Sequence, residues 1–154
     1  MIHTLEPIVE QHPFFAGMDP KHIELIAGCA KNVRFEPDQV IFHEGERAEH
    51  FYLIRKGLVA VQCVIPNNGL TTLHTVGPDE VLGWSWLFAP HRFHFDGRAQ
   101  QPTLALEFDG RCLREKCDKD HDLGYEIYKR FTQIVTERLE ATRMQLLDVY
   151  GKRD

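Results

Sequence analysis

The spacing of hydrophobic and polar positions changes twice along the chain. At the start it is helical, and it predicts short helices over residues 1–12 and 20–30. The first of these ends before Pro13, and Asp19 followed by Pro20 is typical of an N-cap and a first helical residue. We expect these helices to cover the rest of the domain and to carry no chemistry of their own.

The spacing becomes two from Val33 onward, as in half-buried β-strands. The segments are short, rich in Val, Ile, Phe and Thr, and separated by turn-forming Gly, Pro, Asn and Asp. The predicted strands are residues 32–35, 39–43, 50–54, 58–64, 71–76 and 103–108. Regular short strands of this kind favour a small sandwich or jelly roll with Greek-key pairing.

Helical spacing returns after the last predicted strand. Asp109 is an expected N-cap for a short helix to about Cys117. Lys119-Asp120 then begins a long helix that runs to about Tyr150. The sequence therefore predicts a mainly β domain with helices on both sides, the last of them unusually long.

The long helix carries two sets of apolar positions. Ile127, Phe131 and Ile134 form a stripe that we expect to face the sheets. The second set, called the seam below, has steps of three and four residues: Val135, Leu139, Thr142, Leu146 and Val149. Because such a helix cannot bury its far half on one small domain, the seam predicts a coiled-coil-like homodimer. The alternative is that the helix folds back on the sheets.

Length and composition define the general class of protein. The chain has 154 residues, of which 43% are hydrophobic, so it is expected to form one domain with its own core. Its formal charge of −5 argues against nucleic-acid binding by electrostatics. There is no long apolar run and no signal-peptide pattern at the N-terminus, so we expect a cytoplasmic protein that does not bind membranes.

The four cysteines give no metal or redox motif. They are Cys29, Cys63, Cys112 and Cys117, and only the last two are close in sequence. Their spacing fits neither a redox pair of the C-x-x-C type nor a zinc knuckle. We interpret all four as structural or incidental.

The segment from Gly83 to Ala99 has the composition of a binding site. It combines a glycine at its entry, one hydroxyl, two arginines, two histidines and five bulky aromatic residues. A turn at the glycine can bring backbone N–H groups close to an anion, and an arginine can add a bidentate charge. The alternative is a loop that its own aromatic side chains plug.

Several segments of the chain resemble the cyclic-nucleotide-binding domain that begins the catabolite-activator (Crp/Fnr) regulators. The similarity covers roughly residues 8–150. The matching segments are His12–Met18, Phe35–Glu46, Phe51–Val61, Gly77–Gly83 and Arg98-Ala99. The resemblance implies a β-roll over residues 32–108, a helical cover over residues 1–31, and helices over residues 109–150 that pair two subunits. The whole chain, 1–154, is then one sensor module for signal transduction.

The resemblance also implies a phosphate-binding cassette, from which this chain departs. The family has a glutamate after the glycine of the turn, where this chain has Trp84. Arg92 is the nearest candidate for the phosphate-binding arginine, but Phe93 and His94 follow it where small residues are expected. The step from Arg92 to Arg98 is also about one residue longer than in the family. These departures argue against ordinary cAMP binding, since each lost bond to a charged group costs roughly 1.5–3 kcal/mol.

The expected ligand is a cyclic nucleotide (cAMP or cGMP) or another small anion. Gly83 and Ser85 would supply backbone amides and a hydroxyl, Arg92 would bind the anion, and Arg98 would brace the loop. The remaining candidates, which would shape or block the pocket, are Trp84, Trp86, Phe93 and His94.

Two interpretations from other classes remain open. The first is a ligand-free module that binds a protein partner while aromatic side chains fill its pocket. The second is a cupin-like metal enzyme, for which His91, His94 and Asp96 are candidates, although the His-x-His run of cupins is missing. Ser85 does not lie in a Gly-x-Ser-x-Gly elbow, so we expect no enzyme. Because the sequence stops soon after Tyr150, we expect no recognition helix and no direct DNA binding.

Overall fold

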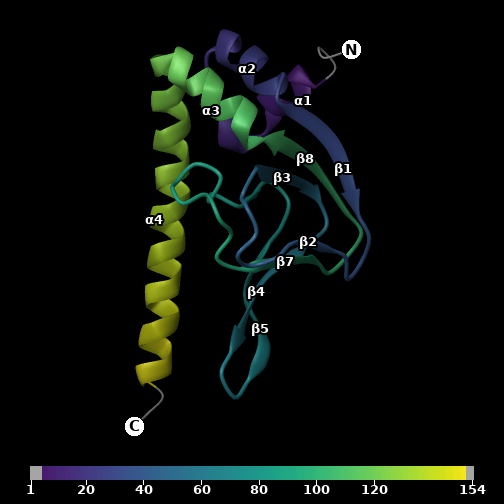
Figure 1. The fold of residues 1–154 in the computed structure, drawn as a ribbon, viewed down its shortest axis with the longest axis vertical. Coiled ribbons are helices and arrows are strands. Elements are labelled where there is room, and N and C mark those ends of the chain that lie inside the picture. The colour runs from purple at the N-terminus through teal and green to yellow at the C-terminus, as the bar shows by residue number, and fades with distance from the viewer. Residues whose placement is uncertain (1–4, 152–154) are drawn as a thin grey trace.

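The computed structural model describes residues 5–151 (Figure 1). The N-terminal cover consists of α1 (Glu6–Gln11), a short 3-10 helix (Pro13–Phe15) and α2 (Pro20–Ala27). The carboxylate of Asp19 accepts a hydrogen bond of 2.9 Å from the backbone N–H of Lys21, which confirms the predicted N-cap. Residues 1–4 of the predicted first helix lie outside the described residues.

Two antiparallel sheets of four strands form the body of the domain. The strands are β1 (Ala30–Phe35), β2 (Val40–Phe42), β3 (His50–Lys56), β4 (Val59–Ile65), β5 (Gly69–Val76), β6 (Val81–Leu82), β7 (Asp96–Ala99) and β8 (Thr103–Asp109). One sheet has the order β1-β8-β3-β6 and the other β2-β7-β4-β5. Sequence neighbours rarely pair, as expected for the crossing connections of a jelly roll. The predicted fold class is confirmed.

An aromatic cluster at the centre of the domain joins the sheets to the long helix. The ring of Phe51 lies between the rings of Trp86 and Phe108, with centroids 4.9 and 4.6 Å away. Phe131 meets Phe51 edge-on at 5.0 Å. Because Phe131 comes from the last helix, this cluster fixes the first half of that helix to the β-roll.

Two helices follow the last strand: α3 (Gly110–Lys119) and α4 (His121–Gly151). The carboxylate of Asp109 accepts hydrogen bonds from the N–H groups of Arg111 and Cys112, at 3.0 and 3.1 Å, which confirms the predicted cap of α3. On α4, Ile127 and Phe131 are fully buried, as the stripe predicted.

The far half of α4 runs alongside the β4–β5 hairpin (Figure 1). The side-chain amide of Gln145 donates a 3.3 Å hydrogen bond to the carbonyl of Leu73, so this half of the helix lies beside β5. Leu139, Leu146 and Val149 of the seam are nevertheless 67%, 54% and 58% exposed. These three seam positions therefore face away from the sheets, although the helix itself runs beside β5.

A disulfide bond joins Cys29 and Cys112, whereas Cys63 and Cys117 are free thiols. The two bonded residues are 83 positions apart in sequence, so spacing alone could not pair them. The disulfide ties the chain just before β1 to the first turn of α3, at the two ends of the β-roll. Within residues 5–151, no helix is apolar enough over a sufficient length to cross a bilayer.

Candidate functional site

A pocket opens at the mouth of the β-roll, where the Gly83–Ala99 segment meets β2, β4 and β5. Its lining residues are Phe42, Val61, His74, Val76, Val81, Leu82, Gly83, Trp84, Ser85, Phe93, His94 and Phe95. Five of the eight candidate residues from the sequence lie here: Gly83, Trp84, Ser85, Phe93 and His94. The segment is therefore at the pocket, as its composition indicated.

Gly83 directs the chain from β6 into this segment. Its φ of +89° lies in the left-handed region, which other residues adopt only with strain. A Cβ atom at this position would lie 3.5 Å from the ring of Phe93, in ordinary contact. Gly83 is therefore favoured by its positive φ, and not by a lack of space for a side chain.

Trp84 and Ser85 follow this turn and face the pocket. Trp84 is half-buried, and its carbonyl accepts a 3.1 Å hydrogen bond from the N–H of Leu87, which closes the next turn. Ser85 is buried. The Trp84 side chain thus forms part of the pocket wall. The resemblance implies a glutamate at this position.

Trp86 does not shape the pocket, contrary to the sequence-based expectation. It is fully buried in the aromatic cluster with Phe51 and Phe131, and its carbonyl accepts a hydrogen bond from the guanidinium of Arg114. Because residues 84–87 form a turn, Trp84 and Trp86 point to different surroundings. Composition could not distinguish the pocket tryptophan from the core tryptophan.

Phe93 and Phe42 fill the interior of the mouth. Their rings are stacked, with centroids 3.8 Å apart and an angle of 9° between the planes. Phe42 lies directly over Gly97, where a Cβ atom would come within 2.8 Å of the ring. The glycine of β7 therefore makes room for the Phe42 side chain at the mouth of the β-roll.

Arg92 does not reach the pocket, which corrects its expected role as the anion ligand. Its guanidinium donates a 2.9 Å hydrogen bond to the carbonyl of Gly45 on the exposed side of the segment. The backbone explains this orientation, since Arg92 forms an isolated antiparallel bridge with Arg47, flanked by hydrogen bonds of 2.7 to 3.0 Å between residues 91–93 and 45–48. Side chains alternate along an extended chain, so an inward Phe93 places Arg92 outward.

Arg98, near the end of the segment on β7, is not among the residues that line the pocket. Its guanidinium donates to the side-chain oxygen of Gln62 at 3.3 Å and to the carbonyl of Asp38 at 3.2 Å. These contacts connect β7 to β4 and to the turn before β2. They are the contacts of a residue that holds the loop in place.

His74 is a pocket residue that the sequence analysis did not single out. It lies on β5, and burial, together with the guanidinium of Arg138 on α4, lowers its pKa to about 4. At neutral pH the imidazole is uncharged. The sequence alone did not indicate that His74 has a lowered pKa. The charge that acts on it belongs to Arg138, which lies 64 positions further along the chain on α4.

Asp96 is occupied by local contacts. One of its carboxylate oxygens accepts a 2.7 Å hydrogen bond from the N–H of Glu44 and lies 3.7 Å from the imidazole of His43. Among the described residues, no group of three or more His, Cys, Asp or Glu side chains is arranged to hold a metal ion.

The lining of this pocket carries no permanent charge, and Arg138 faces His74 from the adjoining groove. No Asp, Glu, Lys or Arg of the described residues lines it. Two stacked phenyl rings and one indole occupy the space around it.

The β-roll, its helical cover and the long final helix have the architecture of a regulatory sensor domain. The model of the cyclic nucleotide-binding domain family matches residues 32–120, and the chain belongs to this family.

Similar proteins agree with this assignment. The chain is 23% identical over 146 residues to the "CRP-like cAMP-activated global transcriptional regulator" of Mycobacterium tuberculosis, covering 94% of this chain and 63% of the relative. The chain thus spans less than two thirds of that relative's length. A putative cyclic nucleotide-binding protein from Geobacter metallireducens has a TM-score of 0.77 at 25% identity, covering 89% of this chain and 96% of that one. A cyclic nucleotide-binding domain from Methylobacillus flagellatus has a TM-score of 0.79 at 20% identity, covering 96% and 83%.

Proposed function

We propose that this chain is a homodimeric regulatory module of the cyclic nucleotide-binding domain family that works without a cyclic nucleotide. The observation that carries the proposal is the uncharged pocket, in which Phe42 and Phe93 stack and Trp84 replaces a carboxylate. The proposed output is an arrangement of α4 that a second copy or a protein partner reads.

The chemistry of the pocket supports the loss of nucleotide binding. A cyclic phosphate needs a fixed positive partner, and the candidate arginine, Arg92, is bonded to Gly45 on the outside. A ribose hydroxyl needs an acceptor, and the indole N–H of Trp84 can only donate. Two missing bonds to charged groups reduce affinity by roughly two to four orders of magnitude.

The seam supports dimerisation through α4. Leu139, Leu146 and Val149 each expose more than half of their surface in the single chain. Positions spaced by three and four residues fall on one side of a helix and pack well against a second helix. Burying this side against the partner's α4 is the simplest way to remove these apolar side chains from water.

The contact between the pocket and α4 supports a regulatory role. A groove lined by Trp84, Phe88 and Val135 runs between the Gly83–Ala99 segment and the start of the seam. The ring of Phe88 also meets that of Tyr128 on α4, with centroids 6.1 Å apart. A change in the conformation of the Gly83–Ala99 segment would therefore alter its contacts with α4.

Sedimentation analysis of the purified chain tests the proposal. We expect a dimer at micromolar concentration whose dissociation constant is unchanged by millimolar cAMP or cGMP. Leu139→Lys should give a folded monomer, because it places a charge in the seam. Met144→Lys is the matched control: Met144 is similarly exposed but is turned roughly 140° from Leu139 around the helix. A monomeric parent chain, or a dimer that needs a nucleotide, would contradict the proposal.

A second function, sensing of a small uncharged molecule, is favoured by one observation. The space left in the pocket is bordered by the hydroxyl of Ser85 and the neutral imidazole of His74, which can orient a polar group between apolar walls. Native mass spectrometry of the freshly purified protein would reveal such a molecule as added mass. The Ser85→Ala variant should lose it.

A further inference from the structure

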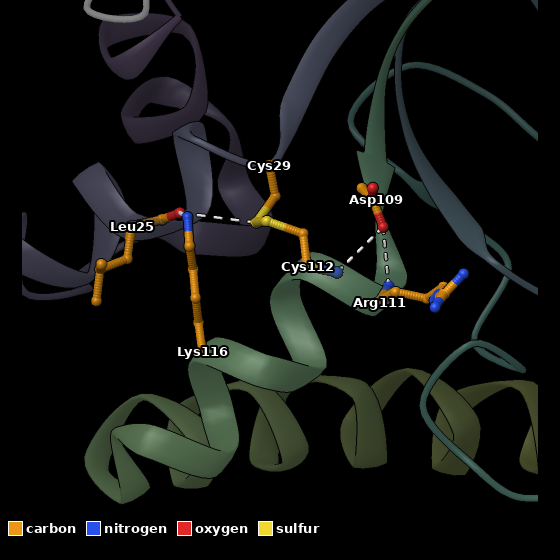
Figure 2. The surroundings of a disulfide bond; sticks show 6 residues. All are labelled: Leu25, Cys29, Asp109, Arg111, Cys112 and Lys116. Atoms are coloured by element: carbon orange, nitrogen blue, oxygen red, sulfur yellow. Dashed lines mark hydrogen bonds between the residues drawn. A yellow bond between two sulfur atoms is a disulfide. The ribbon is translucent and has the colours of Figure 1, made fainter.

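The disulfide lies at a junction of three elements (Figure 2). Cys29 stands between α2 and β1, and Cys112 lies in the first turn of α3. Their Cα atoms are 5.9 Å apart. The backbone pairing next to it is independent of sulfur, since the N–H of Asp109 donates a 2.8 Å hydrogen bond to the carbonyl of Cys29.

The disulfide can be approached from one side. A surface groove over it is lined by Gly28, Cys29, Ala30, Lys31, His50, Glu107, Asp109 and Cys112. Cys29 is only 7% exposed, whereas Cys112 is half-buried. A thiolate that enters this groove therefore meets the sulfur of Cys112 more readily than that of Cys29.

The ammonium group of Lys116 and the sulfur of Cys29 both lie near one backbone oxygen, that of Leu25. The ammonium group of Lys116 donates a 2.7 Å hydrogen bond to the carbonyl of Leu25, and the Sγ atom of Cys29 lies 3.9 Å from the same oxygen (Figure 2). Gly28 makes this approach possible, because a Cβ atom there would lie 2.9 Å from the Lys116 nitrogen. A thiolate at Cys29 would be stabilised by this ammonium, and a stabilised thiolate is the better leaving group.

We propose that the Cys29–Cys112 bond is a reversible thiol–disulfide exchange site for low-molecular-weight thiols. The thiolate of such a thiol attacks Sγ of Cys112, the bond between the two cysteines breaks, and Cys29 leaves as a thiolate that then takes a proton from solvent. A second thiol molecule attacks the mixed disulfide and releases Cys112. The protein gains two electrons and two protons, and two thiols become one small disulfide.

Reduction would loosen the helical cover while leaving the β-roll intact. Without the disulfide, α2 and α3 remain joined by the hydrogen bond from Lys116 to Leu25 and by the 3.5 Å contact between His22 and Asp120. The pairing of β1 with β8 remains complete over six residue pairs. The redox state would therefore change how firmly the cover is held to α3. This proposal does not depend on the proposed function.

The two free thiols, Cys63 and Cys117, are separate from the disulfide and can be removed before the test. Burial, with help from Asp118 and Asp120, raises the pKa of the Cys117 thiol to about 11, so it stays protonated and unreactive near neutral pH. Cys63 is half-buried on β4, far along the chain from the junction. A Cys63→Ala/Cys117→Ala background then reports on the disulfide alone.

The experiment equilibrates the folded background protein with reduced and oxidised glutathione at several ratios, traps thiols by alkylation, and identifies the products by peptide mass spectrometry. We expect reversible reduction without denaturant, a glutathione adduct on Cys112 and not on Cys29, and faster amide exchange in residues 6–27 of the reduced form. Reduction that occurs only in denaturant, or an adduct confined to Cys29, would overturn the proposal.

Lysine variants test the role of the cation separately. Lys116→Met should slow reduction about threefold, since exchange rates change by roughly that factor for each tenfold change in thiol acidity. Lys119→Met is the matched control, because Lys119 is an exposed lysine of the same helix. Equal reduction rates in the two variants would contradict the assignment of Lys116.

Discussion

The phenyl ring of Phe42 lies parallel to that of Phe93, with 3.8 Å between their centroids. The two rings come from β2 and from the end of the Gly83–Ala99 segment, and they meet inside the mouth of the β-roll. This pair and Trp84 line the pocket at the mouth of the β-roll. The account of function given above depends on this arrangement.

Removal of one ring should destabilise the protein strongly. Phe93 is 7% exposed, and Phe-to-Ala changes in cores ordinarily cost about 3–5 kcal/mol. We expect Phe93→Ala to lower the free energy of unfolding, measured in urea, by about 3 kcal/mol. The exposed neighbour serves as the control: Arg92→Ala removes one hydrogen bond and should cost about 1 kcal/mol. Equal effects of the two changes would show that the stack contributes little.

The close approach of Phe42 to β7 gives a second prediction. In Gly97→Ala the new methyl group would lie 2.8 Å from the Phe42 ring, so either the ring or the strand must move. Overpacking of this kind costs about 1–3 kcal/mol. We expect this loss in urea unfolding, together with changed aromatic signals in near-UV circular dichroism.

Gly45→Ala is a useful comparison for this variant. Gly45 has a φ of +89° but no atom within 4 Å of a Cβ position, so its cost of about 1 kcal/mol is conformational. The near-UV spectrum should stay unchanged. A spectral change in Gly45→Ala, or its absence in Gly97→Ala, would argue against packing of Phe42 on Gly97.

Most of the fold could be predicted from the sequence because its signals are local. The alternating segments and the capping residues Asp19 and Asp109 are read over a few positions, and both caps and six strands are present. The strands that were missed are β6, with two residues, and β7, with the sequence Asp-Gly-Arg-Ala. Neither strand contains an alternating apolar run from which it could be predicted. Each forms because it pairs with neighbouring strands of its sheet.

The site was predicted less completely, because its contacts are not local. The sequence showed where the pocket-forming segment begins, at Gly83. It could not show that Phe42, from a strand about fifty positions earlier, fills the pocket, or that pairing with residues 45–48 turns Arg92 outward. The disulfide belongs to the same group of features, since its partners are 83 residues apart.

The low pKa of His74 gives a pH prediction. Burial and Arg138 lower its folded pKa to about 4, below the ordinary value of 6.5, so the unfolded chain binds more protons between these values. Stability contributed by the neutral imidazole is complete above pH 6.5 and is lost as the pH falls from about 6.5 to about 4. Urea unfolding at several pH values should show this decline.

Variants of the pair identify the source of the decline. His74→Gln should flatten the pH dependence between pH 4 and 6.5, because no imidazole then titrates. Arg138→Met should raise the pKa of His74, measured by NMR titration, because a nearby positive charge is removed. An unchanged His74 titration in Arg138→Met would indicate that α4 does not lie against β5 in solution.

The most direct test of the central claim is thermal unfolding of the purified chain with and without millimolar cAMP or cGMP. A ligand at 100 times its dissociation constant stabilises a protein by about 2.7 kcal/mol, which for a chain of this length raises Tm by roughly 5–10 °C. The Mycobacterium tuberculosis relative, named as cAMP-activated, serves as the positive control. We predict no shift for this chain with either nucleotide. A shift of several degrees that the Phe93→Ala variant enlarges would contradict the account, because it would place a nucleotide in the pocket that the aromatic rings fill.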